Sequence, residues 1–220
     1  MSYILSFGDC NMLGVKEYYK NSYVERFAKK LSKSCNNLGY TMATTREMIY
    51  LFHNYNEDEV EVILIQYGLV DSWKTFKYAP YVLYYPDNKF RKIYRKIIKK
   101  YKKIAKSLKL NDILGTQNVV PLNEYKDNIE NIIKNAEDKI IILIDTVPNH
   151  QLDRNSEIMK YNIVLSELSK KYSNCYKLDI YDIFLEHLND YYLDQTHIND
   201  KGYSIISDKL EKLYLSIKEQ

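Results

Sequence analysis

Tyr3-Ile4-Leu5-Ser6-Phe7-Gly8-Asp9-Cys10-Asn11 is the stretch of sequence from which the fold is best predicted. Its apolar run over residues 3–7 has the length and residue types of a buried β-strand, and Gly8 ends the run. The polar residues that follow therefore stand in a loop at the carboxyl end of that strand. In an open parallel sheet, ligands bind beyond this end of the strands. The stretch thus predicts a strand whose carboxyl end places Cys10 in a ligand-binding site.

Four more segments are predicted to be strands, and helical patterns alternate with them. The predicted strands are residues 35–38, 60–66, 139–145 and 175–178. Apolar residues recur at helical spacing around residues 23–31 and over residues 89–110, 123–136, 155–172 and 202–217. This alternation predicts the α/β class, with a three-layer α/β/α sandwich around a five-stranded parallel sheet of flavodoxin-like type. At 220 residues, the chain is expected to form a single domain over residues 1–220.

Two segments in the middle of the chain stand out between the predicted strands. Residues 72–86 are rich in aromatics and contain two prolines, which predicts a long loop that covers the site. Residues 89–110 predict a basic amphipathic helix. Two interpretations of its lysines stay open: a solvated helix face, or a docking surface for an anionic glycan, a nucleotide-linked sugar or an acyl carrier protein.

Composition and charge exclude several classes of protein. The net charge of +3 gives no reason to expect a nucleic-acid partner. No apolar run approaches the roughly 20 residues that span a bilayer, and the start of the chain does not resemble a secretory signal. Three cysteines without a CxxC pair or an even framework fit a reducing compartment, so we expect a cytoplasmic protein. No cluster has metal-ligand spacing and no phosphate-binding loop is present, so no cofactor is expected.

Chemistry-bearing residues stand in three segments. Residues 8–11 and 66–71 follow predicted strands, and residues 194–197 precede the last predicted helix. A thiol that attacks a carbonyl needs a base to take its proton, and the base needs a carboxylate to hold its tautomer. Cys10, His197 and Asp194 fit these three roles in order. A position at a helix N-terminus would lower the pKa of the Cys10 thiol. The other two cysteines, Cys35 and Cys175, are expected to be packing residues.

The same residues resemble a known family. Gly8-Asp9-Cys10 resembles the Gly-Asp-Ser of the SGNH (GDSL-like) hydrolases, with cysteine in place of the nucleophilic serine. Residues 194–203, Asp-Gln-Thr-His-Ile-Asn-Asp-Lys-Gly-Tyr, are similar to the closing Asp-x-x-His-x-x-x-x-Gly block of that family. Because the two blocks lie near opposite ends of the chain, the resemblance covers essentially its whole length. It implies an SGNH-type fold and an ester hydrolase or acyltransferase with a Cys10, His197 and Asp194 triad.

The two middle blocks depart from the family pattern. Residues 37–44 resemble the second block, but Met42 stands where the oxyanion-hole glycine usually does. Gly68-Leu-Val-Asp71 resembles Gly-x-Asn-Asp, with Val70 in place of asparagine, as in members associated with surface-polysaccharide synthesis. The resemblance implies an oxyanion hole from the backbone of Cys10, Met42 and Gly68. Loss of one donor costs on the order of 3 kcal/mol of transition-state stabilisation.

Three polar residues beside these motifs have two interpretations. Asn11 and Asp71 are candidates for substrate binding, but turn chemistry also explains Asn11, and Asp71 can tie down its own loop. Asp9 is expected to cap the turn after the first strand.

Two functions follow from the sequence. The first is an SGNH-like esterase or acyltransferase acting on an acylated carbohydrate, with a small-molecule or glycan substrate and an acyl carrier or biosynthetic enzyme as a partner. The second is a catalytically silent member that binds a glycan or a partner enzyme through the same cleft. The departures at Cys10, Met42 and Val70 motivate the second.

Overall fold

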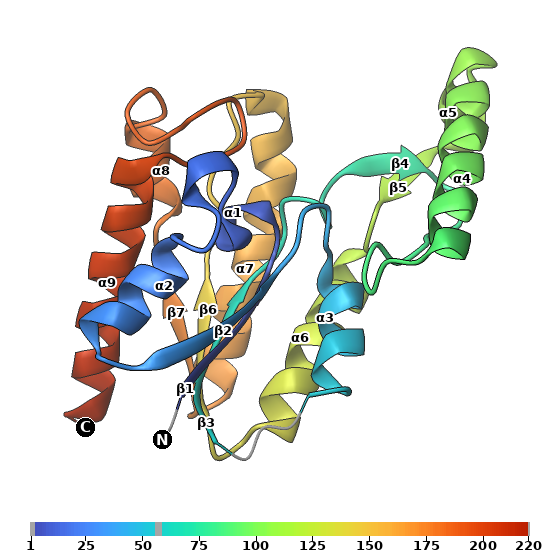
Figure 1. Cartoon of the computed structure of the whole chain (residues 1–220). Helices are drawn as coiled ribbons and strands as arrows, with labels where there is room; N and C mark the ends of the chain where they lie inside the picture. Colours follow the sequence, from blue (N-terminus) through green and yellow to red (C-terminus); the bar gives the residue numbers. More distant parts are fainter. Residues whose placement is uncertain (1–2, 56–58, 220) are drawn as a thin grey trace.

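A five-stranded parallel sheet forms the centre of the computed structural model, which describes residues 3–55 and 59–219 (Figure 1). Its strands are β1 (Tyr3–Gly8), β2 (Ser34–Gly39), β3 (Val60–Gln66), β6 (Ile140–Ile144) and β7 (Cys175–Leu178). They lie in the order β2-β1-β3-β6-β7, and every neighbouring pair is parallel. The predicted α/β fold with five parallel strands is therefore confirmed.

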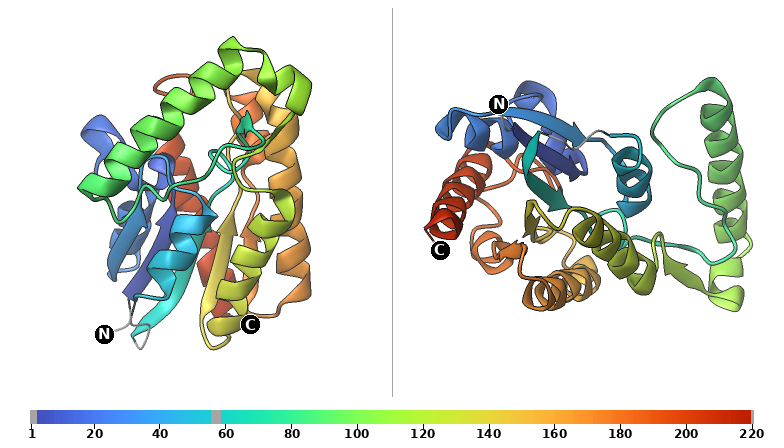
Figure 2. Two further views of the ribbon diagram at one scale, coloured as in Figure 1. Left: turned by 90° about the vertical axis from the view of Figure 1, so that its right-hand side faces the viewer. Right: turned by 90° about the horizontal axis from the view of Figure 1, so that it is seen from below.

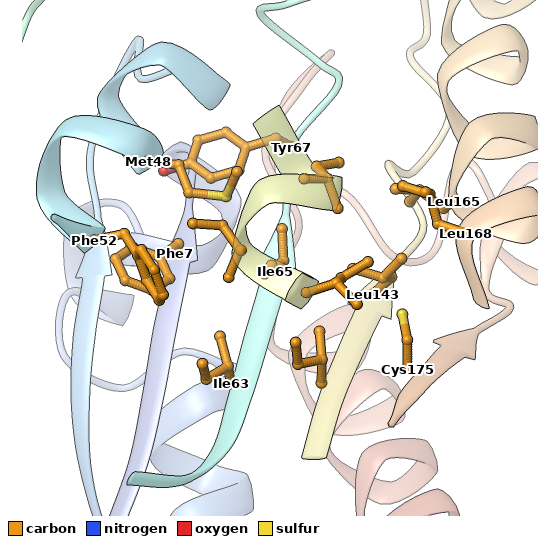
Figure 3. Close-up of a cluster of buried hydrophobic side chains, with 14 of the residues drawn as sticks. Phe7, Met48, Phe52, Ile63, Ile65, Tyr67, Leu143, Leu165, Leu168 and Cys175 are labelled. Atoms are coloured by element: carbon orange, nitrogen blue, oxygen red, sulfur yellow. The ribbon is translucent and has the colours of Figure 1, made fainter. Parts of the chain in front are cut away.

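One face of the sheet packs against α3 (Thr45–Phe52), α6 (Leu122–Asn135) and α7 (Asn155–Lys171). Figure 3 shows part of this core, in which strand side chains meet those of α3 and α7. Its labelled members include Phe7, Ile63, Ile65, Leu143, Met48, Phe52, Leu165 and Leu168. Burial of each such side chain contributes on the order of 1.5–3 kcal/mol to folding.

The opposite face packs against α2 (Tyr23–Lys30), α8 (Tyr181–Glu186) and α9 (Asp200–Lys218). Successive strand residues point to opposite sides of a sheet. In β3, for example, Val62 and Leu64 therefore pack on this face, while Ile63 and Ile65 pack on the other. Figure 2 shows helices on both sides of the strands. The apolar runs of the sequence thus contribute side chains to two hydrophobic cores, one on each face of the sheet.

Hydrogen-bonded caps fix where several helices begin. Thr44 and Glu47 form a capping box at the start of α3, and Ser22 with Glu25 does the same for α2. Asn199 caps α9, as the sequence predicted for Asn199 or Asp200. The short α1 (Cys10–Leu13) follows β1 directly. Two short 3₁₀ turns, η1 (Lys16–Tyr18) and η2 (Leu152–Arg154), complete the connections.

An arm formed by residues 74–118 extends from the body (Figures 1 and 2). A two-stranded antiparallel ribbon of β4 (Lys74–Phe76) and β5 (Thr116–Asn118) forms its base. Between these strands the chain forms α4 (Lys89–Ser107) and α5 (Leu110–Leu114). The expectation that residues 72–86 form only an irregular loop is therefore wrong at β4. The basic helix predicted over residues 89–110 is confirmed, although it ends at Ser107.

Within residues 3–55 and 59–219, no helix has both the length and the apolar character that crossing a membrane requires.

Candidate active site

Cys10 lies at the first position of α1, directly after the turn that ends β1. Asp9 precedes the helix, and its side chain accepts a hydrogen bond from the backbone N–H of Asn11 at 2.9 Å. Asp9 therefore caps this turn, as the sequence predicted. A Cβ at position 8 would lie 2.6 Å from the Cβ of Met12, so only glycine fits where the helix folds back on the strand.

The thiol of Cys10 is buried in an apolar cluster and is 6% exposed. Leu69, Ile158 and Tyr181 form this cluster with it. Burial raises the pKa of the Cys10 thiol well above its ordinary value, and the nearby carboxylate of Asp9 raises it further. The expectation that a helix N-terminus lowers this pKa is therefore wrong. A helix of a single turn has only a small dipole. Its effect on the thiol pKa is therefore outweighed by the effect of desolvation.

Asp194 and His197 form a hydrogen-bonded pair before α9. The Nδ1 atom of His197 lies 2.8 Å from Oδ2 of Asp194, and Oδ1 of Asp194 accepts from the backbone N–H groups of Thr196 and His197. Partial burial opposes ionisation of Asp194. The hydrogen bonds from His197 and Thr196 outweigh it and hold the pKa of Asp194 at about 2. Asp194 is therefore a carboxylate at neutral pH, and it leaves Nε2 of His197 free to face a reactant.

Asn11 connects this pair to the first strand end. Its side-chain Nδ2 donates to the carbonyl of Thr196 at 3.2 Å, and its Oδ1 accepts from the N–H of Ile198 at 3.2 Å. These two hydrogen bonds bracket His197. The structure therefore ties the residue after Cys10 to the backbone on both sides of His197.

A further connection comes from the loop after β6. The side-chain amide of Asn149 donates to Oγ1 of Thr196 at 3.2 Å, and the N–H of His150 donates to the carbonyl of Gln195 at 3.1 Å. Tyr192 donates its hydroxyl proton to the carbonyl of Pro148. The loop that carries His197 is thus held from two sides. Only the position of Asn149 after a strand end could have indicated this role.

Met42 has a backbone conformation that favours glycine. Its φ is 67°, in the left-handed region, although a side chain is present. The turn around it is fixed because Tyr40 donates its N–H to the carbonyl of Gly8 and Ala43 donates its N–H to the carbonyl of Tyr40. In the part of the chain that the structure describes, no protein acceptor binds the N–H of Met42. The N–H of Cys10 lies within hydrogen-bonding reach of the sulfur of Cys10 itself. The N–H of Met42 is therefore available to a ligand.

Gly68 and Val70 follow β3 in the third block. Gly68 has a φ of 136°, and a Cβ there would lie 2.4 Å from Oγ1 of Thr146. Val70 is buried and supplies no polar atom from its side chain at this position. Any oxyanion stabilisation from this block must therefore come from the backbone.

Asn11 and Asp71, the two candidates for substrate binding, are both buried. Asp71 accepts hydrogen bonds from the N–H and hydroxyl of Thr45 at 2.9 and 2.8 Å, so it ties the third block to the start of α3. Burial raises the pKa of Asp71 to about 7, although the Thr45 bonds oppose this shift. Both side chains bind other parts of this chain, and their role in substrate binding stays a prediction. For Asp71, the hydrogen bonds from Thr45 fit the alternative that it ties down its own loop.

Arg154 is a charged residue beside the site that the sequence did not indicate. Its guanidinium donates to the carbonyl of Leu69 at 3.0 Å and lies 5.0 Å from the ring centre of Trp73. Leu69 packs against Cys10, so Arg154 binds the backbone of a residue that contacts the candidate nucleophile. Burial lowers the pKa of Arg154.

Two absences hold for the described ranges, 3–55 and 59–219. No hydrogen bond joins the sulfur of Cys10 to the imidazole of His197. No group of three or more His, Cys, Asp or Glu side chains has the arrangement of a metal site.

Comparison with known proteins gives structural likeness without sequence likeness. No family model matches the chain, and no curated protein matches it. A lipolytic protein of the G-D-S-L family from Veillonella parvula has a similar structure, with 14% identity, a TM-score of 0.65 and coverage of 98% of this chain and 99% of that one. A lipase/acylhydrolase from Enterococcus faecalis has 15% identity, a TM-score of 0.65 and coverage of 96% and 94%.

The acetylxylan esterase Axe2 from Geobacillus stearothermophilus is a third structure of this kind. It has 17% identity, a TM-score of 0.62 and coverage of 96% of this chain and 93% of that one. Its solved catalytic mutants change a histidine in one case and, in the other, an aspartate three residues before that histidine. Together these likenesses show that the chain has the SGNH/GDSL hydrolase fold.

Proposed function

We propose that this protein is an SGNH-like esterase or acyltransferase acting on an acylated carbohydrate, with Cys10 as nucleophile, His197 as general base and Asp194 as its orienting carboxylate. The observation that supports this most is the pair of hydrogen bonds from Asn11 to either side of His197. They hold the loop of the base against the turn that carries the thiol. The Asp194 to His197 spacing also equals that of the two residues changed in the Axe2 catalytic mutants.

In the first step, Nε2 of His197 accepts the thiol proton while the sulfur of Cys10 attacks the ester carbonyl. Because the pKa of this thiol is raised, the proton leaves during the attack and not before it. The carbonyl electrons move to oxygen, and backbone N–H groups of Cys10, Met42 and Gly68 stabilise the oxyanion. When the carbonyl re-forms, the C–O bond breaks and the leaving alcohol takes the proton from His197. A thioester on Cys10 remains.

In the second step, water or a sugar hydroxyl attacks the thioester. His197 accepts the proton of the attacking oxygen and returns it to the sulfur as the C–S bond breaks. Asp194 stays ionised throughout, since its pKa is about 2, and stabilises the imidazolium. Hydrolysis and acyl transfer share this path and differ only in the acceptor.

The carbohydrate substrate and the biological setting are also part of the proposal. Some solved structures with this fold are acetylxylan esterases, and residues 68–71 resemble those of members associated with surface-polysaccharide synthesis. Cys10, Cys35 and Cys175 are all free, which fits a reducing cytoplasm. An acyl carrier protein or a biosynthetic enzyme would be the partner that supplies or accepts the acyl group.

Intact-mass spectrometry with an activated acyl ester tests the nucleophile. We expect an acyl adduct on the wild type that disappears in Cys10→Ala, with turnover of p-nitrophenyl acetate falling at least a hundredfold. Unchanged turnover in Cys10→Ala, without a Cys10-dependent adduct, would overturn the proposal.

A specific set of observations favours a second function, a catalytically silent protein that binds a glycan or a partner enzyme. The sulfur is buried among apolar side chains, it makes no hydrogen bond to His197 in the described ranges, and Val70 offers no side-chain donor. Glycan binding that survives in Cys10→Ala, with no hydrolysis by the wild type or by Cys10→Ser, supports this alternative. Turnover gained in Cys10→Ser supports a hydrolase site whose serine has been replaced.

A further inference from the structure

A cleft of about 580 Å³ lies between α4 of the arm and the body of the protein. Met42 and Val70 form part of its inner wall, and Trp73 and residues 80–82 and 84 continue that wall outward. Figure 2 shows α4 running alongside the body at this place. The cleft therefore begins at the candidate oxyanion hole and extends to the arm.

The lining of this cleft is strongly basic. Among the residues that the structure describes, it contains six cationic side chains and no carboxylate: Lys74, Lys92, Arg95, Lys96, Lys99 and Lys102. Helix α4 holds ten of the 32 basic residues of the chain and none of its 29 acidic residues. The positive charge is thus local to the cleft and its helix, because the rest of the chain has more acidic than basic residues.

Carboxylates outside the cleft neutralise only part of this charge. Asp87 pairs with Lys92 and Arg95, and Glu157 pairs with Lys74. Lys96, Lys99 and Lys102 form no ion pair with any described residue. Lys102 is also half-buried, and burial lowers its pKa. Cations held together without partners have a net affinity for an anion.

Aromatic side chains on the opposite wall are held in fixed positions. The hydroxyl of Tyr81 donates to Glu47 at 2.8 Å, and the guanidinium of Arg95 lies 4.9 Å from the ring centre of Tyr84. The guanidinium of Arg154 lies 5.0 Å from the ring centre of Trp73. Rigid rings beside cations suit a ligand that joins a phosphate group to a sugar or a base, because such rings can stack on it.

We propose that this cleft binds the phosphate or diphosphate group of the substrate and places the attached acyl group at Met42 and Cys10. This inference rests on the proposed function and names its substrate class: a phosphorylated acyl compound rather than a neutral ester. The phosphate has two sources that share this chemistry. One is a nucleoside diphosphate joined to an acylated sugar, and the other is the phosphopantetheine end of an acyl donor.

Calorimetric titration of full-length Cys10→Ala with inorganic pyrophosphate, uridine diphosphate and coenzyme A tests the binding directly. We expect binding that weakens at high salt and that weakens tenfold or more in Lys99→Gln/Lys102→Gln. The matched control is Lys100→Gln/Lys103→Gln, which removes two charges from exposed positions of the same helix outside the cleft. Tighter binding of uridine diphosphate than of coenzyme A indicates a nucleotide sugar, and the reverse order indicates an acyl donor. No binding of any probe at millimolar concentration, or an equal loss in both double variants, would overturn the inference.

Turnover assays separate this inference from the proposed function. Lys99→Gln/Lys102→Gln should leave p-nitrophenyl acetate hydrolysis unchanged and reduce kcat/KM for an acetylated sugar phosphate about tenfold. Probe binding without any Cys10-dependent turnover contradicts the proposed function but supports the anion site. Turnover with the same kcat/KM whether or not the substrate has a phosphate contradicts the anion site but supports the esterase.

Discussion

The side-chain amide of Asn11 holds His197 in place from both sides, by accepting from the N–H of Ile198 and donating to the carbonyl of Thr196. Asn11 itself is fixed at the start of α1, where its N–H binds the capping carboxylate of Asp9. One buried side chain therefore sets the position of the candidate base relative to the candidate nucleophile at residue 10. The geometry of the proposed site depends on this contact between the two ends of the chain.

Replacing Asn11 by Asp tests this positioning role. The variant keeps an acceptor for the N–H of Ile198 but places a carboxylate oxygen against the carbonyl of Thr196, which repels it. We expect kcat to fall by about 10–100-fold with little change in KM, because a small displacement of a catalytic group has a large effect on rate. The free energy of unfolding should fall by about 1–3 kcal/mol.

The control for this variant is Asn36→Asp, since Asn36 binds Tyr55 at a distance from the site. Ester hydrolysis and urea unfolding are measured for both variants. If Asn11→Asp loses stability but keeps its kcat, Asn11 is a structural tether only.

In the parallel sheet, β1, β3 and β6 were predictable because each is a short, mainly apolar run with turn residues after it. The helix α3 was not predicted, because Thr45–Phe52 is only eight residues long and follows directly on a segment interpreted as a motif. The capping pair Thr44 and Glu47 was the signal that could have found it. The strands β4 and β5 have three residues each and are separated in sequence by the helices α4 and α5. A local sequence pattern therefore cannot indicate that they pair.

The site was predictable only as far as its motifs reach. The motifs identified Cys10, Asp194 and His197, but the contacts that position them join residues far apart in sequence. The environment of Cys10 shows the same limit. Leu69, Ile158 and Tyr181 come from three separate segments, and their packing raises the thiol pKa where the local helix turn alone would lower it.

The left-handed backbone at Met42 gives a second prediction. Glycine adopts this φ without strain, whereas a β-branched residue is strongly disfavoured there. We expect Met42→Gly to unfold within about 1 kcal/mol of the wild type and Met42→Val to lose about 2 kcal/mol. Because the proposed oxyanion donor is the backbone N–H, Met42→Gly should keep its kcat. Equal stability of the two variants in urea would show that this φ is not maintained in solution.

The buried thiol gives a third prediction, on reactivity. With its pKa raised, Cys10 should react with iodoacetamide at pH 7 at least ten times more slowly than a free cysteine, and the rate should still rise at pH 9. The Asp9 carboxylate contributes to this shift, and burial raises the pKa of Asp9 itself to about 7. Asp9→Asn should therefore accelerate alkylation above pH 7 and have little effect at pH 5.

Peptide mass spectrometry measures the adducts separately. Cys35 and Cys175, whose pKa values burial raises to about 11 and about 12, serve as internal references. Rapid modification of Cys10 at pH 7 that reaches a plateau would mean that the thiolate is already present.

Asp71 gives a fourth prediction, on how stability depends on pH. Burial raises the pKa of its carboxyl from 3.8 to about 7, so the folded state binds this proton more tightly than the unfolded state. The free energy of unfolding should therefore decrease as the pH rises through the window from about 4 to 7.

Asn in place of Asp71 keeps the acceptor for Thr45 and cannot ionise. When the pH rises from 5 to 8, the free energy of unfolding, measured in urea, should fall in both proteins. The fall should be about 2 kcal/mol smaller in Asp71→Asn than in the wild type. The exposed Asp127→Asn is the control and should follow the wild-type curve. A wild-type pH dependence in Asp71→Asn would show that this carboxyl ionises at its ordinary pKa, and that Thr45 binds a carboxylate throughout.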